Sequence, residues 1–438
     1  MEKFYDCKDA ANGLKLWGLP DRHAVRPFVK MTLPSIKVDQ PFLIDFDAKW
    51  LPAESKNSTS RTYAEVAAGS PVLAEPPVSP GPSSSAPLVA PMSNDSFLIP
   101  QGYLNSKSPI RLRLISAKRR DFKTLAQPDT RRQSGNSFVP LAPLLSNSLV
   151  FHVHGGGFVA CSSFTHTTNT RAWAIDTDAP ILSVDYRLAP AFSFPIQLTE
   201  CVIAYKWALA NMSLLGSTGE RIIVVGDSSG GNLVTGLIIK AITEGFRVPD
   251  AAILIYPAMY LAMSLSCARV ISVVDPMLNL KMLHALLPAY IPSDYGVENY
   301  YVSPALVPDS ILAQFPPTRI LAGQCDPLLD DSIYFYQRLK ELRVDAEIVV
   351  FARVSHGFLN LNAIVVEADD AITLVSLWLL ELMGHPVKRT LVSDTPPIAQ
   401  TNTGAVKQTA LVVSSVPGSS SGSAVALPVD AVVDSDRV

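Results

Sequence analysis

Residues 222–233 read IIVVGDSSGGNL, and this stretch decides the fold. The apolar run Ile222–Val225 predicts a buried strand, and the pattern from Gly230 to Gly245 predicts a helix. Between them, Gly226-Asp227-Ser228-Ser229-Gly230 fits the G-x-S-x-G turn that lifts a nucleophilic serine above a sheet. The following helix directs the positive end of its dipole toward that serine. The motif alone is weak, because a plain Gly/Ser turn between strand and helix has the same residues.

Strand and helix patterns alternate on both sides of this turn. The β-rich runs are 110–114, Leu149–Val153, Ile181–Val184, Ala252–Ile255, Ile320–Ala322 and Ile348–Phe351. The helical patterns are Gln197–Asn211, Asp330–Leu342 and Val365–Met383. The later strands are almost continuously apolar, as in a parallel sheet covered on both faces. In the first run, Arg111 and Arg113 alternate with apolar residues and predict a half-exposed strand. The sequence predicts an α/β fold with a mostly parallel central sheet.

Bulk properties exclude several other classes. The chain has 438 residues, a net charge of −3, 48% hydrophobic residues and five scattered cysteines. This slightly negative net charge does not predict nucleic-acid binding. The odd, dispersed cysteines argue against a disulfide framework or structural zinc, and favour reduced thiols in the cytoplasm. The N-terminus lacks the apolar segment of a signal peptide, and no run of about 18 apolar residues predicts a transmembrane helix.

The organisation predicted along the chain has four parts. Residues 1–50 are an N-terminal segment with a short helix at Tyr5–Trp17, assigned as a contribution to the cap. Residues 51–100 are a Pro/Ser-rich flexible linker, because such a composition buries too little apolar surface to order. Residues 101–386 form the catalytic domain, and 387–438 form a disordered tail. Within the domain, residues 259–307 break the alternation of strands and helices. They are assigned as a lid over the site, called the cap below, or alternatively as a surface excursion.

A glycine-rich motif follows another strand. His154-Gly155-Gly156-Gly157 ends the run Leu149–Val153. Glycines let the backbone approach a ligand and expose N–H groups. Such groups, with that of Ser229, can bind the oxyanion of a tetrahedral intermediate. A phosphate loop is disfavoured, because the P-loop lysine and the G-x-G-x-x-G spacing are missing. His154 and Gly155 are assigned to orient the loop.

An acid and a base follow two later strands. Asp326 comes after Thr318–Ala322, and His356 comes after Glu347–Phe351. The carboxyl ends of strands are where the sites of open α/β sheets gather. The order serine, aspartate, histidine is the one that α/β-hydrolases use. Asp330 and Asp331 compete for the acid role, but they have the pattern of carboxylates in a first helical turn.

These motifs together predict a serine ester hydrolase. His356 takes the proton of Ser228, Ser228 attacks the ester carbonyl, and Asp326 holds the imidazole in the right tautomer. Water then hydrolyses the acyl-enzyme. The chemistry needs no metal and no cofactor.

The core from about 149 to 383 resembles the hormone-sensitive lipase family of α/β-hydrolases, and in particular its eukaryotic members. The blocks that carry the resemblance are FHVHGGGFVA (151–160), DYRLAP (185–190), LLGSTGER (214–221), GDSSGGNL (226–233), SPALVPDS (303–310) and DPLLDDS (326–332). The resemblance implies a lipase for acylglycerols or sterol esters in the cytoplasm, acting peripherally at lipid droplets or membranes. It also implies Ser228, Asp326 and His356 as the triad, and Gly156, Gly157 and Ser229 as the oxyanion donors.

The chain departs from the family in three places. Ala191 stands where the family usually has a glutamate, which puts the loop geometry in doubt. Only about 100 residues precede the catalytic domain 101–386, whereas the animal members carry a large N-terminal domain. Their long phosphorylated insertion, corresponding to 275–302, is short here. Arg131-Arg132-Gln133-Ser134 matches a basophilic kinase site, but such tetrapeptides are common by chance. The sequence predicts neither the oligomeric state nor the acyl-chain preference.

Three other functions fit the same fold. A carboxylesterase for short soluble esters would share the triad and differ in the acyl pocket and lid. A non-catalytic small-molecule receptor would lose the triad histidine, which His356 argues against. A serine peptidase is disfavoured by the complete His-Gly-Gly-Gly motif.

Overall fold

The computed structural model describes residues 36–44, 109–118 and 145–392 without 263, 265, 272–274, 276, 294, 363 and 388, together with 409–413 and 425–429. The predicted helix Tyr5–Trp17, the linker 51–100 and Ser134 lie outside these residues. Within the described ranges, we find no helix long and apolar enough to cross a membrane.

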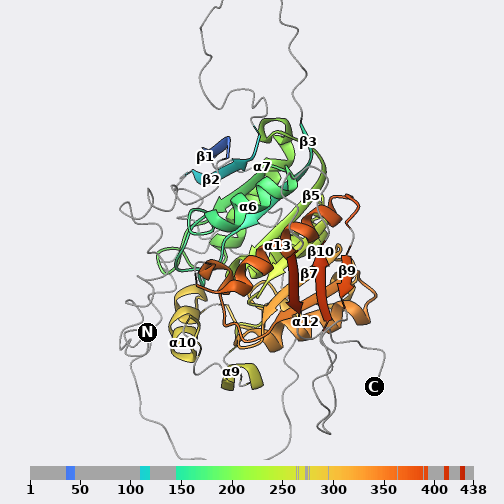
Figure 1. Ribbon diagram of the computed structural model, residues 1–438. Helices are drawn as coiled ribbons and strands as arrows, with labels where there is room; N and C mark the ends of the chain where they lie inside the picture. The colour runs from blue at the N-terminus through green and yellow to red at the C-terminus, as the bar shows by residue number, and fades with distance from the viewer. Residues whose placement is uncertain are drawn as a thin grey trace, which may run out of the picture.

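A twisted sheet forms the centre of the molecule (Figure 1). It has eight strands, in the order β1-β2-β4-β3-β5-β6-β7-β8. Its strands are β1 Val38–Ile44, β2 Ile110–Ser116, β3 Ser146–Val153, β4 Ile181–Asp185, β5 Ser217–Asp227, β6 Ala251–Ile255, β7 Thr318–Gly323 and β8 Ala346–Phe351. β1 and β2 run antiparallel at one edge, and the strands from β4 to β8 are parallel to one another. The predicted mostly parallel α/β fold is confirmed.

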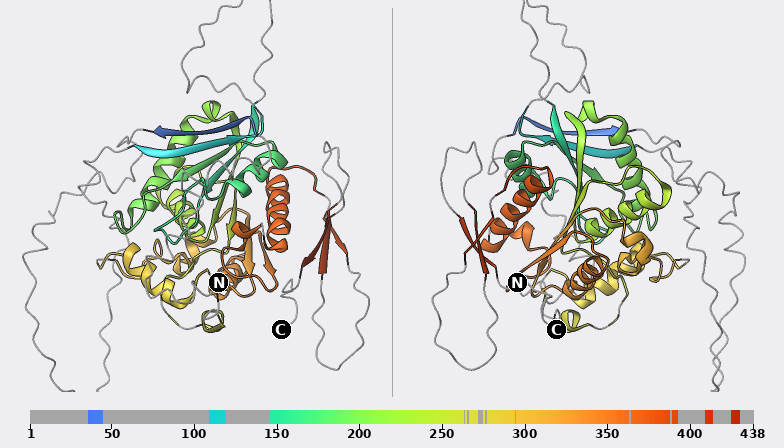
Figure 2. Two further views of the ribbon diagram at one scale, coloured as in Figure 1. Left: turned by 60° about the vertical axis from the view of Figure 1, so that its left-hand side comes forward. Right: turned by 90° about the vertical axis from the view of Figure 1, so that its right-hand side faces the viewer.

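Helices cover both faces of this sheet (Figure 2). They are α6 Thr167–Thr177, α7 Ile196–Ala210, α8 Ser229–Glu244, α9 Cys267–Ile271, α10 Leu280–Tyr290, α11 Asp309–Leu312, α12 Leu329–Glu341 and α13 Val366–Leu382. One core cluster joins the sheet to α7, α8 and α12, and a second joins it to α6 and α13. Covering both faces explains why strands such as β6 are buried along their whole length.

The strand β2 is not half-exposed as its alternation predicts. Arg111 is exposed, but the Arg113 side chain is only 5% exposed. Its guanidinium donates to both carboxylate oxygens of Asp39, at 2.7 and 2.9 Å, and to Thr167 Oγ1. Arg113 is buried because of tertiary contacts: Asp39 lies on β1, a strand that the sequence does not predict, and Thr167 begins α6.

Two domain boundaries also need correction. The sequence assigns the N-terminal segment 1–50 to the cap. Within its described part, however, Val38–Ile44 form β1 of the central sheet and pair along their length with β2. In the tail expected to be disordered, the described residues form three antiparallel strands, β9 Arg389–Val392, β10 Thr409–Val413 and β11 Val425–Val429. Short β-favouring runs such as TALVV and VALPV, within a polar tail, account for the difference.

Candidate active site

The candidate nucleophile Ser228 stands on the sharp turn between β5 and α8. Its φ and ψ are 53° and −120°, outside the ordinary regions for a non-glycine residue. Such a turn requires very small neighbours: a Cβ on Gly230 would lie 2.1 Å from the carbonyl oxygen of Val153. The N–H of Ser228 donates to the carbonyl oxygen of Ile255 at 2.8 Å, which ties the turn to β6. The strand-turn-helix context that the motif needs is present.

The three predicted triad residues form one hydrogen-bonded chain. His356 Nδ1 lies 2.8 Å from Asp326 Oδ2, and His356 Nε2 lies 2.8 Å from Ser228 Oγ. A carboxylate only accepts, so Nδ1 carries the proton of the neutral ring and Nε2 accepts the serine hydroxyl proton. All three residues are buried. The geometry thus leaves Nε2 ready to remove a proton from Ser228.

The electrostatics of the histidine suit a general base. Burial acts to lower the pKa of His356, but the adjacent carboxylate of Asp326 outweighs it and raises that pKa above the ordinary value. The second oxygen of Asp326, Oδ1, accepts the N–H of Leu328 at 2.8 Å, which fixes the carboxylate. The arrangement therefore stabilises the imidazolium that a proton transfer from Ser228 would create.

The rival carboxylates Asp330 and Asp331 lie in the first turn of α12, as their pattern predicts. Asp330 Oδ2 accepts the N–H of Ala268 at 2.8 Å, and Asp331 Oδ2 accepts from Arg269 Nη2 at 2.9 Å. Burial raises the pKa of Asp331 to about 6, although Arg269 opposes this shift. Both carboxylates hold α9 of the 259–307 insertion, so their contacts are with the cap and not with His356.

The loop after β3 curls against the nucleophile turn. Gly156 has a φ of 118°, and a Cβ there would lie 2.2 Å from the carbonyl oxygen of Ala160. The Gly156 carbonyl accepts the N–H groups of Val159 and Ala160, which closes the turn. Gly157 and Ser229 line the same cavity as Ser228, and Gly156 shapes the loop behind them. Of the predicted oxyanion residues, Gly157 and Ser229 therefore lie beside the serine.

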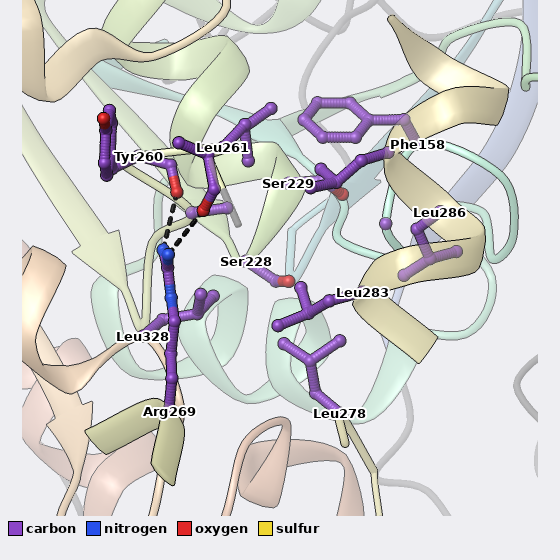
Figure 3. Close-up of a pocket in the computed structure, with 14 residues that line it drawn as sticks. Phe158, Ser228, Ser229, Tyr260, Leu261, Arg269, Leu278, Leu283, Leu286 and Leu328 are labelled. Carbon is purple, nitrogen blue, oxygen red and sulfur yellow. Dashed lines mark hydrogen bonds between the residues drawn. The ribbon is translucent and has the colours of Figure 1, made fainter. Parts of the chain in front are cut away.

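A largely apolar cavity opens on Ser228 (Figure 3). Its lining includes Phe158, Leu261, Leu278, Leu283, Leu286 and Leu287. Figure 3 shows the Ser228 hydroxyl directed toward the leucines of the cap. The insertion 259–307 thus forms part of the wall of the site, which favours a lid over a simple surface excursion.

Arg269 stands at the edge of this cavity and fastens the cap. Its guanidinium donates to the carbonyl oxygens of Tyr260 and Ala262 (Figure 3). It also donates to the carboxylate of Asp331. The Arg269 side chain is 4% exposed, so its charge is compensated within the protein. The apolar wall is consequently held by a polar anchor on α12.

Comparisons with known proteins match this fold and site. A family model described as the alpha/beta hydrolase fold matches residues 150–360. The carboxylesterase NlhH of Mycobacterium tuberculosis is 30% identical over 232 residues, which cover 52% of this chain and 72% of that protein. The chain belongs to the α/β-hydrolase fold family.

Two further relatives refine the comparison for this α/β hydrolase. The human hormone-sensitive lipase is 48% identical over 145 residues, or 33% of this chain and 14% of that protein. An esterase of Pyrobaculum calidifontis has a similar solved structure, with a TM-score of 0.55 and 28% identity over 63% of this chain and 82% of that one. The predicted likeness to hormone-sensitive lipases is confirmed over the catalytic region. The chain spans 14 to 29% of the length of the mammalian hormone-sensitive lipases it matches.

A buried pair behind the oxyanion loop is absent from the sequence prediction. Asp227 Oδ1 accepts the N–H of Gly155 at 2.9 Å, and His166 Nε2 donates to Asp227 Oδ2, also at 2.9 Å. Burial acts to raise the pKa of Asp227, but His166 outweighs it and keeps that pKa below its usual value. Asp227 sits in the G-x-S-x-G motif, which could have drawn attention to it, whereas nothing local singles out His166.

The two predicted loop-orienting residues lie against this pair. His154 is buried, its ring stacks on Tyr186 at a centroid distance of 4.3 Å, and its Nδ1 donates to the carbonyl oxygen of Gly155 at 2.7 Å. Burial lowers the pKa of His154, so its ring is neutral at physiological pH. These contacts place His154 beneath the loop rather than at the reacting atoms.

Gly155→Ala is expected to lower kcat for ester hydrolysis by about 10²- to 10³-fold, the usual cost of losing an oxyanion donor. The new Cβ would lie 2.4 Å from Asp227 Oδ2, so the loop must move away from Ser228. Steady-state kinetics on a soluble butyrate ester would measure the loss. The matched control is Gly296→Ala, whose Cβ would have its nearest neighbour at 3.8 Å. A Gly155→Ala enzyme within two-fold of wild type would contradict the role of this loop.

Proposed function

We propose that this chain hydrolyses carboxylic esters through an acyl-enzyme on Ser228. The observation that carries the proposal is the hydrogen-bond chain from Asp326 through His356 to Ser228, at the base of an apolar cavity. The lipase and carboxylesterase names of the relatives support the same reaction.

The proposed reaction has two halves. His356 Nε2 takes the Ser228 proton as Oγ attacks the ester carbonyl carbon, and the imidazolium then gives this proton to the leaving alcohol. In the second half, His356 takes a proton from water, the resulting nucleophile attacks the acyl carbon, and Ser228 recovers a proton as the acid leaves. Asp326 keeps its charge throughout and stabilises the imidazolium.

The proposed oxyanion site consists of the backbone N–H groups of Gly156, Gly157 and Ser229. The negative oxygen of each tetrahedral intermediate would lie beside these groups, at the N-terminus of α8. Both the donors and the helix dipole favour negative charge there. We assign His154 and Gly155 to holding this loop in place.

The proposed substrate has an apolar acyl group, because leucines of the cap line the cavity beside Ser228. Acylglycerols or sterol esters are the substrates that the likeness to hormone-sensitive lipases favours. We further propose a peripheral contact of the cytoplasmic protein with a lipid surface such as a droplet. A carboxylesterase for short soluble esters is the second candidate, supported by the carboxylesterase relative.

A series of acyl esters from butyrate to oleate tests this substrate class. Each methylene buried in the cavity contributes about 0.8 kcal/mol, so kcat/KM is expected to rise by up to about four-fold per methylene until the cavity is filled. Emulsified diacylglycerol and cholesteryl ester should follow, with Ser228→Ala as the control for background hydrolysis. A kcat/KM that falls steadily beyond butyrate would favour the soluble-ester function. No hydrolysis by the wild-type protein would contradict both candidates and favour a receptor.

A further inference from the structure

A second carboxylate lies against the loop of the candidate base. Asp275 is a buried residue of the cap insertion, between α9 and α10. Its Oδ2 accepts the backbone N–H of His356 at 2.9 Å. Its Oδ1 accepts the N–H groups of Met277 and Leu278, at 2.7 and 2.8 Å. Burial raises the pKa of Asp275, while the neighbouring His356 and the three N–H donors oppose this shift and favour the ionised carboxylate.

This contact joins the wall of the cavity to the base. Leu278 lines the cavity beside Ser228, and its N–H and that of His356 bind the same carboxylate. A displacement of the cap that moved Leu278 would therefore also remove the acceptor from the loop of His356. The hydrogen bond spans 81 residues of sequence, so it forms only when the cap is packed against the catalytic loop.

The charge of Asp275 also acts on the imidazole. The charged and titratable groups facing His356 are Asp326 after β7, Asp275 from the cap, Asp227 at the end of β5 and the ring of Tyr256, 5.0 Å away between centroids. Burial opposes a charge on His356, whereas Asp326 first and Asp275 next raise its pKa. Tyr256 is neutral, because burial raises its pKa well above the usual value.

We propose that Asp275 is a positioning residue through which the closed cap fixes the catalytic histidine and stabilises its imidazolium. The inference rests on the proposed function. It adds that Asp275 holds His356 and stabilises its imidazolium only when the cap is in place. A purely structural alternative is that Asp275 shapes the turn before α10 and has no influence on His356.

The variant Asp275→Asn distinguishes the positioning role of Asp275 from the purely structural one. Asparagine keeps one carbonyl oxygen, which can still accept the N–H groups of Met277 and Leu278, but it removes the negative charge and puts an NH2 donor where the His356 N–H had an acceptor. The acid limb of a kcat/KM profile reports the deprotonation of the base in the free enzyme. Because a negative neighbour raises the pKa of a histidine, its loss is expected to move this limb to lower pH by about 0.5 to 1 unit. The less stable imidazolium should also lower the plateau kcat by roughly three- to ten-fold.

Asp250→Asn is the matched control. Asp250 Oδ2 likewise accepts a backbone N–H, that of Ile222, but Ile222 lies in the part of β5 before the Ser228 turn. This variant should keep the wild-type acid limb. Asp275→Glu, which retains the charge, should also keep it, and provides the test if Asp275→Asn does not fold. Circular dichroism and thermal unfolding of the full chain would establish that each variant is folded.

The outcomes are distinct. A downward shift of the acid limb in Asp275→Asn, with no shift in Asp250→Asn, supports the inference. A folded Asp275→Asn enzyme with a wild-type acid limb overturns it, whatever its kcat, and so does a downward shift in Asp275→Glu. Wild-type protein without ester hydrolysis would instead remove the proposed function, and the inference with it.

Discussion

Ser228→Ala is expected to lower kcat for ester hydrolysis by about 10⁴- to 10⁶-fold, the loss typical of removing the nucleophile of a serine triad. The variant removes the oxygen that lies 2.8 Å from His356 Nε2 and leaves no group to form the acyl-enzyme. Initial rates measured over a range of p-nitrophenyl butyrate concentrations would give the loss of kcat. Thermal unfolding should be little changed, because the substitution removes one atom beside a cavity.

A second histidine variant sharpens this test. His356→Ala should cost about as much as Ser228→Ala, and the double variant little more than either, because residues that act as one unit are not additive. Losses that multiply in the double variant would mean that Ser228 and His356 act independently. A Ser228→Ala enzyme with more than about one hundredth of the wild-type kcat would exclude Ser228 as the nucleophile.

Asp326→Asn is expected to lower kcat by about 10⁴-fold with the fold intact. The asparagine amide can donate to Nδ1 of the histidine, which would leave the ring proton on Nε2, where it blocks proton removal from Ser228. The same kinetic assay measures the loss. The decisive comparison is Asp330→Asn, since Asp330 accepts the N–H of Ala268 and makes no triad contact. A larger loss from Asp330→Asn than from Asp326→Asn would reverse our assignment of the acid.

The parts of the fold that sequence predicts are those with a local signal. β5 and α8 are apolar and periodic, and the glycines between them favour a tight turn, so the sequence predicts this unit to within a few residues. The triad follows from it, because Asp326 and His356 come directly after β-rich runs. Parallel strands bring their carboxyl ends to one edge of the sheet. Such an arrangement can be inferred without knowing any side-chain contact.

The parts that sequence does not predict depend on distant partners. The helix α6 reads TTNTRAWAIDT and has no clear apolar face, and its place is set by packing against α13. Arg113 has the pattern of a surface residue and is buried only because Asp39 accepts its guanidinium. Likewise, Asp275 and His166 carry no motif. Their roles depend on His356 and Asp227, which are 81 and 61 residues away.

The most direct test of the account is to find which residue carries a covalent adduct. The wild-type chain would be treated with a fluorophosphonate, which reacts with activated serine nucleophiles, and its peptides analysed by mass spectrometry. We expect one adduct, on the peptide that contains Ser228, and none in Ser228→Ala or His356→Ala. An adduct on another residue, or ester hydrolysis that continues in a protein without any adduct, would contradict it.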